Sequence, residues 1–113
     1  MHSVNDEFPP FILNGVDSNQ DMVEVNGMIR NINHTLAADC GLALSTELGV
    51  VDFENGVCLR ATFIVDPNNI IQSVSCNALD TGRNADEIVR TLKALQAGGL
   101  TGCAWQEGED FVA

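Results

Sequence analysis

The sequence predicts an α/β fold with a mixed β-sheet. Its hydrophobic patterns follow the order strand, helix, helix, strand, strand, helix, which is typical of that class. Two observations carry the prediction. Apolar runs at 59–65 and 70–76 are separated by a turn, and an amphipathic stretch begins after Asn84. The length of 113 residues is that of one domain.

The first half of the chain predicts one strand and two helices. Pro9-Pro10 stops any helix that arrives from upstream, and 11–16 then has the pattern of a short buried strand. Asp39 is placed to cap a second helix, which ends at Gly49. The first helix is expected over about 19–31, because its apolar residues fall on one face: Met22, Val25, Ile29 and Ile32.

The apolar runs at 59–65 and 70–76 predict an antiparallel hairpin. The turn between them is Asp66-Pro67-Asn68-Asn69, in which proline presets φ and asparagine tolerates the left-handed region. Side chains alternate along a strand, so we expect Ala61, Phe63 and Val65 to face the core. The opposite face would then carry Arg60, Thr62 and Ile64.

The last helix has the clearest local signals. Asn84 is its expected N-cap, and Glu87 three residues later resembles a capping box. Asp86 and Arg90 are spaced for an i,i+4 ion pair, and Gly98-Gly99 ends the helix. Its core-facing stripe is expected to be Ile88, Val89, Leu92 and Leu95.

Composition excludes several classes of function. The net charge of −11 disfavours binding to nucleic acid, and no apolar run is long enough to span a membrane. The N-terminus lacks the pattern of a secretory signal, so we expect a cytoplasmic protein. The cysteines lack zinc-site spacing, and no metal or other cofactor is expected. They are Cys40, Cys58, Cys76 and Cys103, of which Cys58 and Cys76 are interpreted as small core residues.

Several stretches in order resemble one family. Leu59-Arg-Ala-Thr-Phe-Ile-Val-Asp-Pro-Asn-Asn69 is followed by a strand, and Gly82-Arg83-Asn84 opens the last helix. Upstream, Ile12-Leu-Asn-Gly-Val-Asp-Ser18 resembles a strand of the same family, and Cys103-Ala104-Trp105 resembles the region of its resolving cysteine. Together they resemble the C-terminal part of typical two-cysteine peroxiredoxins, of the alkyl hydroperoxide reductase C type.

The resemblance implies a partial thioredoxin-like fold. Residues 1–97 would form the C-terminal portion of the peroxiredoxin domain, and 98–113 a mobile tail. In the family a peroxidatic thiolate attacks a peroxide, a resolving thiol forms the disulfide, and a dithiol protein or flavoprotein reduces it. The residues expected to contribute here are Arg60, which would line the peroxide pocket, and Cys103, which would be the resolving thiol.

Alternatives remain for the chain and for both residues. In the family the peroxidatic cysteine lies in a Pro-x-x-x-Thr-x-x-Cys segment, and this sequence contains no such segment. We therefore expect the chain alone to be a very poor peroxidase. It would then be a non-catalytic peroxiredoxin fragment, a dimerisation or interaction module, or an unrelated small α/β binding domain. The alternative role for Arg60 is an edge-strand charge that deters aggregation, and the alternative for Cys103 is an incidental thiol in the tail.

The resemblance also implies partners and an unfilled space. The partners are a peroxide substrate, a thioredoxin-like or flavoprotein reductant and a second copy of the chain, paired through the strand at 70–76. In the family a central strand, absent here, lies between the strands like 11–16 and 59–65. We therefore expect these two to close directly or to leave an apolar groove that promotes self-association.

Overall fold

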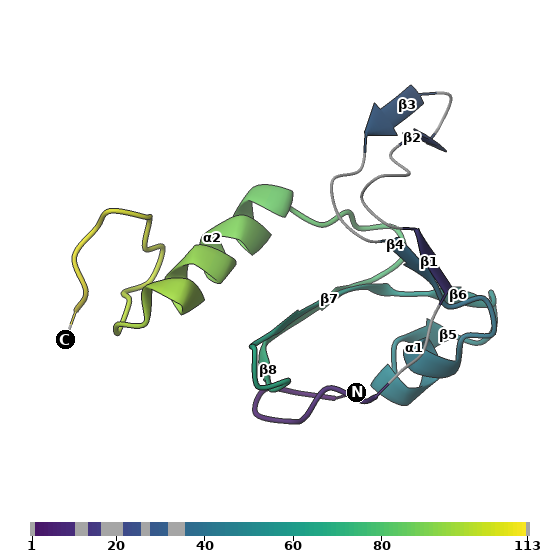
Figure 1. Ribbon diagram of the computed structural model, residues 1–113, viewed down its shortest axis with the longest axis horizontal. Helices are drawn as coiled ribbons and strands as arrows, with labels where there is room; N and C mark the ends of the chain where they lie inside the picture. The colour runs from purple at the N-terminus through teal and green to yellow at the C-terminus, as the bar shows by residue number, and fades with distance from the viewer. Residues whose placement is uncertain (1, 11–13, 17–21, 26–27, 32–35, 113) are drawn as a thin grey trace.

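The computed structural model describes residues 2–10, 14–16, 22–25, 28–31 and 36–112. The fold is α/β, as predicted, but the described strands form separate antiparallel pairs rather than one mixed sheet (Figure 1). The pairs are β1 (Asn14–Val16) with β4 (Leu36–Ala38), β2 (Met22–Val25) with β3 (Met28–Asn31), β5 (Val51–Asp52) with β6 (Val57–Cys58), and β7 (Arg60–Val65) with β8 (Ile71–Asn77). The helices are α1 (Ala43–Leu48) and α2 (Ala85–Ala97).

The predicted hairpin is confirmed as β7–β8. The Asp66 carboxylate accepts hydrogen bonds from the backbone N–H groups of Asn68 and Ile70, both at 2.9 Å, and so closes the turn. Asn69 has a φ of 66°, in the left-handed region that asparagine tolerates. These backbone and side-chain preferences all lie within one short segment, which is why the sequence pattern located the turn correctly.

The N-terminal segment fastens the turn end of this hairpin. The Phe8 N–H donates to the Asn69 carbonyl oxygen at 2.9 Å, and the Asn69 amide donates back to the Phe8 carbonyl oxygen at 2.8 Å. Asn5 and Asp6 exchange backbone hydrogen bonds with Ile71, both at 2.9 Å. Ile71 has no exposed surface, so this junction is the best-buried point of the described structure.

Both ends of α2 match the local signals. The Asn84 side chain accepts hydrogen bonds from the N–H groups of Asp86 and Glu87, and Gly98 ends the helix with a φ of 77°. The predicted Asp86–Arg90 ion pair is wrong. Arg90 instead bonds both carboxylate oxygens of Glu87, at 2.6 and 2.7 Å, because the i,i+3 neighbour presents them side by side. The Glu87 side chain is therefore bonded to Arg90 and does not complete a capping box with the backbone N–H of Asn84.

The predicted core-facing stripe of α2 is largely exposed. Val89 is 47% exposed and Leu92 and Leu95 are each 38% exposed, and none of the residues 85–97, all of them described, is buried. In Figure 1 α2 lies to one side of the β7–β8 hairpin and carries the C-terminal tail at its far end. The apolar periodicity of α2 is therefore real but lacks a matching surface within the described chain.

The second predicted helix is confirmed as α1, although it begins at Ala43 and its N-cap position is Leu42 rather than Asp39. The Asp39 carboxylate accepts hydrogen bonds from the N–H and hydroxyl groups of Ser45, both at 2.7 Å, and from the N–H of Leu44 at 3.3 Å. The Ser45 hydroxyl is the main reason why the pKa of Asp39 lies below its ordinary value. Gly49 ends the helix in the left-handed region, as expected.

The predicted helix over about 19–31 is wrong. Its described residues form β2 and β3, which pair antiparallel from Met22 opposite Asn31 to Val25 opposite Met28. The sequence between them is Asn26-Gly27, the strongest short-range hairpin signal, and it outweighed the helical spacing. Of the strand expected at 11–16, residues 14–16 form β1, and 11–13 lie outside the described residues.

The two strands that flank the expected gap do not close on each other. β1 pairs with β4 and β7 pairs with β8, and these pairs belong to separate sheets in the described chain. Direct closure of β1 on β7 is therefore wrong, and the apolar groove expected between them stays a prediction, because residues 11–13 lie outside the described residues. No helix in the described ranges is both long and apolar enough to cross a lipid bilayer.

Candidate functional site

Arg60 stands where the chain bends sharply into β7. The N–H of Ala61 donates to the carbonyl oxygen of Leu59 at 3.0 Å, a two-residue bond that turns the backbone tightly at Arg60. The Arg60 Nε donates to the carbonyl oxygen of Leu79 at 2.6 Å, and the side chain is exposed. Its guanidinium is therefore anchored at one edge by the backbone, with its Nη groups left for other acceptors.

Arg83 lies beside Arg60, although the two residues are far apart in sequence. Its Nη1 donates to the Ala61 carbonyl oxygen at 2.9 Å. The loop that carries Arg83 is fastened to the hairpin by Asn77, whose amide donates to the Gly82 carbonyl oxygen at 3.0 Å. The open end of the hairpin thus positions two guanidinium groups with backbone oxygens alone.

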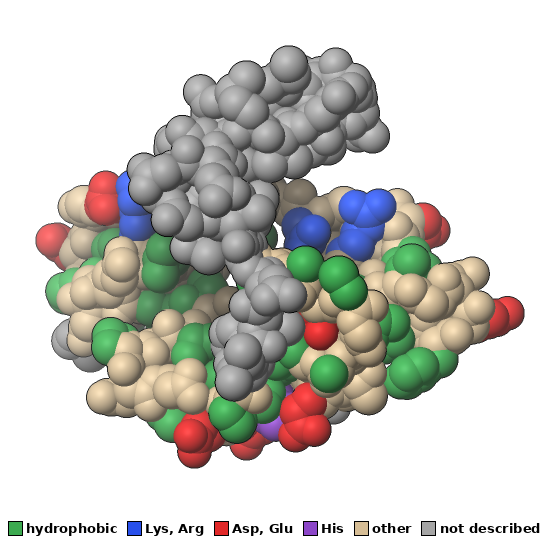
Figure 2. Space-filling view, turned by 45° about the vertical axis from the view of Figure 1, so that its right-hand side comes forward, with side chains coloured by type: hydrophobic (Ala, Val, Ile, Leu, Met, Phe, Trp, Pro, Cys, Tyr) green, Lys and Arg blue, Asp and Glu red, His purple; other side chains and the backbone are tan. Residues whose placement is uncertain are grey.

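Both guanidinium groups line a hollow of about 490 Å³, here named the arginine hollow. This volume falls within the roughly 300–1,000 Å³ typical of small-molecule sites. In the described part of the chain neither Arg60 nor Arg83 pairs with a carboxylate. Figure 2 shows basic side chains in two places on one face, beside one another on the right and next to acidic side chains on the left. The apolar walls of the hollow are Leu48, Val50, Val57, Leu59, Ala61, Phe63 and Leu79.

The predicted division of β7 into two faces holds from Ala61 to Ile64 but is wrong at Arg60 and at Val65. Val65 lines the same groove as Ile64, because the strand register shifts between these two residues, and no residue of β7 is fully buried. Thr62 and Ile64 face α2 across a small cavity, and the rings of Phe63 and Phe8 form a T-shaped pair with centroids 6.0 Å apart. Arg60 was expected on the side of Thr62 and Ile64, yet it lines the arginine hollow together with Phe63. The tight turn at Arg60 interrupts strand alternation, which explains the difference.

Cys103 lies at the opposite end of α2 from the arginine hollow. It is exposed and lines a separate hollow of about 420 Å³ beside Arg90, Ala94 and Gly98. A helix of 13 residues is about 20 Å long. The structure therefore does not bring Cys103 and Arg60 together within one chain.

The tail that carries Cys103 makes specific contacts with α2. The Trp105 carbonyl oxygen accepts a hydrogen bond from Arg90 Nη1 at 2.9 Å, and Lys93 forms an ion pair with Glu107 at 3.3 Å. Phe111 stacks on Trp105 with centroids 6.4 Å apart and lies over Gly99, where a β-carbon would be only 2.5 Å from the ring. Gly99 thus provides the space that lets the tail fold back. Mobility of residues 98–113 stays a prediction.

All four cysteines are free and exposed. The interpretation of Cys58 and Cys76 as core residues is therefore wrong, because Cys58 ends the two-residue strand β6 and Cys76 lies near the open end of β8. Cys58 lines the arginine hollow, a position that sequence reasoning missed, as it missed the contribution of Arg83. The position of Cys58 in the sequence, two residues before Arg60, was the signal that could have predicted its place at the hollow. Across the described ranges no three His, Cys, Asp or Glu side chains gather as a metal site would require.

Comparison with known proteins assigns the family. No protein-family profile matches the chain. A Clostridium pasteurianum protein, named as a peroxiredoxin in the rubredoxin operon, is 39% identical over 92 residues, which are 81% of this chain and 51% of that protein. The alkyl hydroperoxide reductase C of Mycolicibacterium smegmatis is 43% identical over 85 residues, 75% of this chain and 39% of its own. The chain belongs to the peroxiredoxin family.

Solved peroxiredoxin structures confirm the same relationship. The reduced 2-Cys peroxiredoxin of Plasmodium vivax matches 74% of this chain with a TM-score of 0.66 and 38% identity, and 45% of that chain is covered. The alkyl hydroperoxide reductase C of Mycobacterium bovis matches 67% of this chain with a TM-score of 0.59 and 43% identity, and 42% of that chain is covered. The chain spans about half the length, or less, of the peroxiredoxins that it matches.

Proposed function

We propose that this chain forms the arginine side of a thiol-dependent peroxidase that reduces hydrogen peroxide and alkyl hydroperoxides. The observation that carries the proposal is the arginine hollow, where Arg60 and Arg83 have no carboxylate partner in the described chain. Unpaired guanidinium groups beside apolar walls suit a thiolate and the oxygens of a peroxide. The names of the relatives support the same reaction.

The reaction needs a peroxidatic thiolate, which a Pro-x-x-x-Thr-x-x-Cys segment carries in the family. The thiolate sulfur attacks one peroxide oxygen, the O–O bond breaks, and the leaving oxygen takes up a proton to form water or an alcohol. The sulfur is left as a sulfenic acid. Arg60 would favour the thiolate and hydrogen-bond the oxygen on which negative charge develops. Arg83 would hold the same oxygens from the other side.

Cys103 is the proposed resolving thiol. Its thiolate would attack the sulfenic sulfur, forming a disulfide and releasing water, and a thioredoxin-like or flavoprotein dithiol would reduce that disulfide. Because Cys103 and Arg60 lie at opposite ends of α2, this step requires either tail movement or a second copy of the chain. We propose a homodimer or higher oligomer, formed at the edge of β8 that β7 leaves open. We place the reaction in the cytoplasm, where thiols stay reduced.

A chimera tests the catalytic role of Arg60. The segment of the M. smegmatis relative that precedes its match to this chain is joined to this chain, and peroxide consumption is followed with dithiothreitol as reductant. Arg60→Lys should lower the rate by about 100-fold, the usual effect of losing one donor to a developing oxyanion. Arg90→Lys is the matched control for the attack on peroxide, because Arg90 lies outside the arginine hollow, and it should leave the rate of the first turnover, before Cys103 acts, unchanged.

The chain alone should consume peroxide only very slowly. Rapid turnover by the isolated chain that Cys40→Ser abolishes would contradict the proposal. An Arg60→Lys chimera as fast as its parent would equally contradict it.

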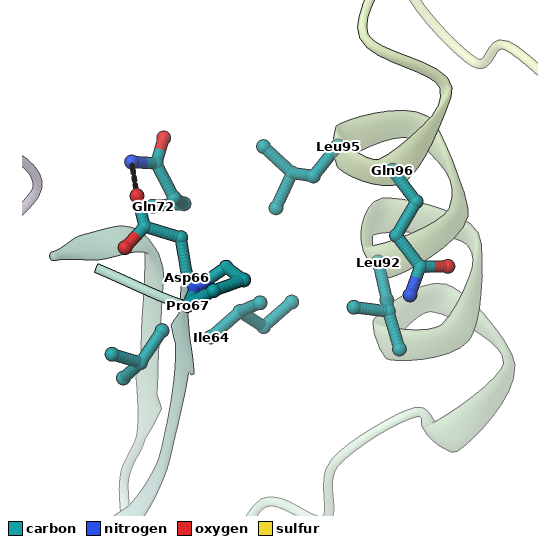
Figure 3. Close-up of a pocket in the computed structure, with 8 residues that line it drawn as sticks. Ile64, Asp66, Pro67, Gln72, Leu92, Leu95 and Gln96 are labelled. Carbon is teal, nitrogen blue, oxygen red and sulfur yellow. Dashed lines mark hydrogen bonds between the residues drawn. The ribbon is translucent and has the colours of Figure 1, made fainter. Parts of the chain in front are cut away.

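A second candidate function is an interaction module without catalysis. It is favoured by a groove of about 760 Å³ between the β7–β8 hairpin and α2, here named the hairpin–helix groove. In Figure 3 Ile64 and Pro67 lie on the hairpin side and Leu92 and Leu95 on α2, across an open space. A chimera without peroxidase activity that still binds a partner through this groove would favour the module.

A further inference from the structure

Cys58 places a thiol at the arginine hollow. It is the last residue of β6, it is exposed, and it lines the hollow together with Arg60 and Arg83. The nearest turn holds Asp52, opposite Val57 in the β5–β6 pair, but its carboxylate accepts hydrogen bonds from the N–H groups of Glu54 and Asn55. The acidic group of this hairpin is thus engaged within its own turn.

The surroundings of Cys58 differ from those of the other three thiols. Cys103 lies beside Arg90, but Arg90 is already paired with Glu87. Cys40 directly follows Asp39, and Cys76 lies outside the arginine hollow. Among the four thiols, Cys58 alone shares a hollow with guanidinium groups that have no carboxylate partner in the described chain. Guanidinium groups without carboxylate partners attract an anionic reagent to the thiol beside them.

We propose that Cys58 is a modification site for anionic low-molecular-weight disulfides. The Cys58 thiol loses its proton to water, and the thiolate attacks one sulfur of the incoming disulfide. A new S–S bond forms at Cys58, the original S–S bond breaks, and the other half leaves as a thiolate. Carboxylates of the attached group would then bind Arg60 and Arg83.

The modification has a consequence for the proposed peroxidase. The attached group would occupy the arginine hollow and cover Arg60, so that a modified chain could not hold a peroxide there. Thiolation of Cys58 itself depends on the geometry of the hollow and not on peroxidase activity. The two proposals can therefore fail independently.

A pair of disulfides with opposite charge tests the proposal on the full chain. Oxidised glutathione is the anionic probe and cystamine the cationic one, and peptide mass spectrometry measures the rate of modification at each cysteine. The ratio of the glutathione rate to the cystamine rate should be about tenfold higher at Cys58 than at Cys76, as expected for unit charges a few ångströms apart in water. Because both rates belong to one thiol, the intrinsic reactivity of that thiol cancels from the ratio.

Removing the cations should remove the preference. In the double variant Arg60→Gln, Arg83→Gln the ratio at Cys58 should fall to that at Cys76, whereas Arg90→Gln should leave it unchanged. If the double variant fails to fold, the same rate ratio measured on the unaltered chain at several salt concentrations tests the role of the cations. The ratio at Cys58 should fall between about 0.01 M and 1 M salt, because the Debye length shrinks from about 30 Å to 3 Å. Equal ratios at Cys58 and Cys76, or a ratio that salt does not change, would overturn the proposal.

Discussion

The β7–β8 hairpin and α2 are neighbours that are stabilised in different ways. The hairpin is held by contacts with residues far away in sequence, and Ile71 at its turn end has no exposed surface. In α2, by contrast, every residue from 85 to 97 is described and none is buried. The helix depends on its caps, on the Glu87–Arg90 pair and on polar contacts with the C-terminal tail that follows it directly in sequence. One element is thus defined by tertiary contacts and the other by local signals.

The substitution Ile71→Ala is expected to have the largest effect among the tests of this difference. Truncating the fully buried isoleucine should lower the free energy of unfolding by about 2–5 kcal/mol, because it leaves a cavity at the junction with the N-terminal segment. Val89→Ala on α2 is the control, and its effect should stay below about 0.5 kcal/mol because Val89 is 47% exposed. Urea unfolding followed by circular dichroism measures both. Equal losses would show that α2 is packed as well as the hairpin.

The cap of α2 should matter more than its apolar face. Asn84→Ala removes the acceptor for two backbone N–H groups and should lower the free energy of unfolding by about 1 kcal/mol. Helical circular dichroism and urea unfolding measure the change. Asn84→Asp retains an acceptor and should keep the stability of the original chain. A loss in Asn84→Asp as large as in Asn84→Ala would mean that the side-chain cap is not what stabilises the helix.

The exposed face of α2 should affect association rather than folding. Leu92 and Leu95 line the hairpin–helix groove, and we expect the isolated chain to self-associate through such apolar surface. Leu92→Gln with Leu95→Gln should shift size-exclusion chromatography towards the monomer, whereas Leu100→Gln, outside the groove, should not. A monodisperse monomer of the original chain, with a cooperative melt above about 65 °C, would contradict this expectation.

The smallest expected effect is the pH dependence of α2. Hydrogen bonding from Arg90 is the main cause that lowers the pKa of Glu87 from its ordinary 4.5. A carboxylate with a lowered folded-state pKa stabilises the fold above its unfolded pKa, and this contribution is lost as the pH falls through the folded pKa. Helical circular dichroism should therefore decrease below pH 4.5. Both Glu87→Gln and Arg90→Gln should flatten that decrease, and a steeper profile in either would contradict the assignment.

Sequence reasoning succeeded where the decisive signals were local. The turn at Asp66–Asn69 and the cap at Asn84 each depend on residues within a few positions, and both were predicted correctly. The hairpin of β2 and β3 was missed because helical spacing was given more weight than Asn26-Gly27. The exposure of the α2 stripe was missed because periodicity shows which face is apolar but not whether anything covers it.

The candidate site was predicted only in part for a related reason. Arg60 was singled out through family resemblance, but Arg83 and Cys58 join it only because the chain turns sharply at Arg60 and the loop before α2 folds back. Neither event leaves a periodic pattern in the sequence. Cys103 was placed on the C-terminal tail from the sequence, yet its position at the far end of α2 from Arg60 required the three-dimensional arrangement.

The contact between Trp105 and α2 gives the tail an optical reporter. Trp105 is the only tryptophan in the sequence, is 4% exposed, and lies two residues after Cys103. Indole emission moves to longer wavelength when water reaches the ring. Release of the tail would expose Trp105 and red-shift the intrinsic fluorescence of the whole protein. Movement of Cys103 can therefore be timed in solution without attaching a label to any thiol.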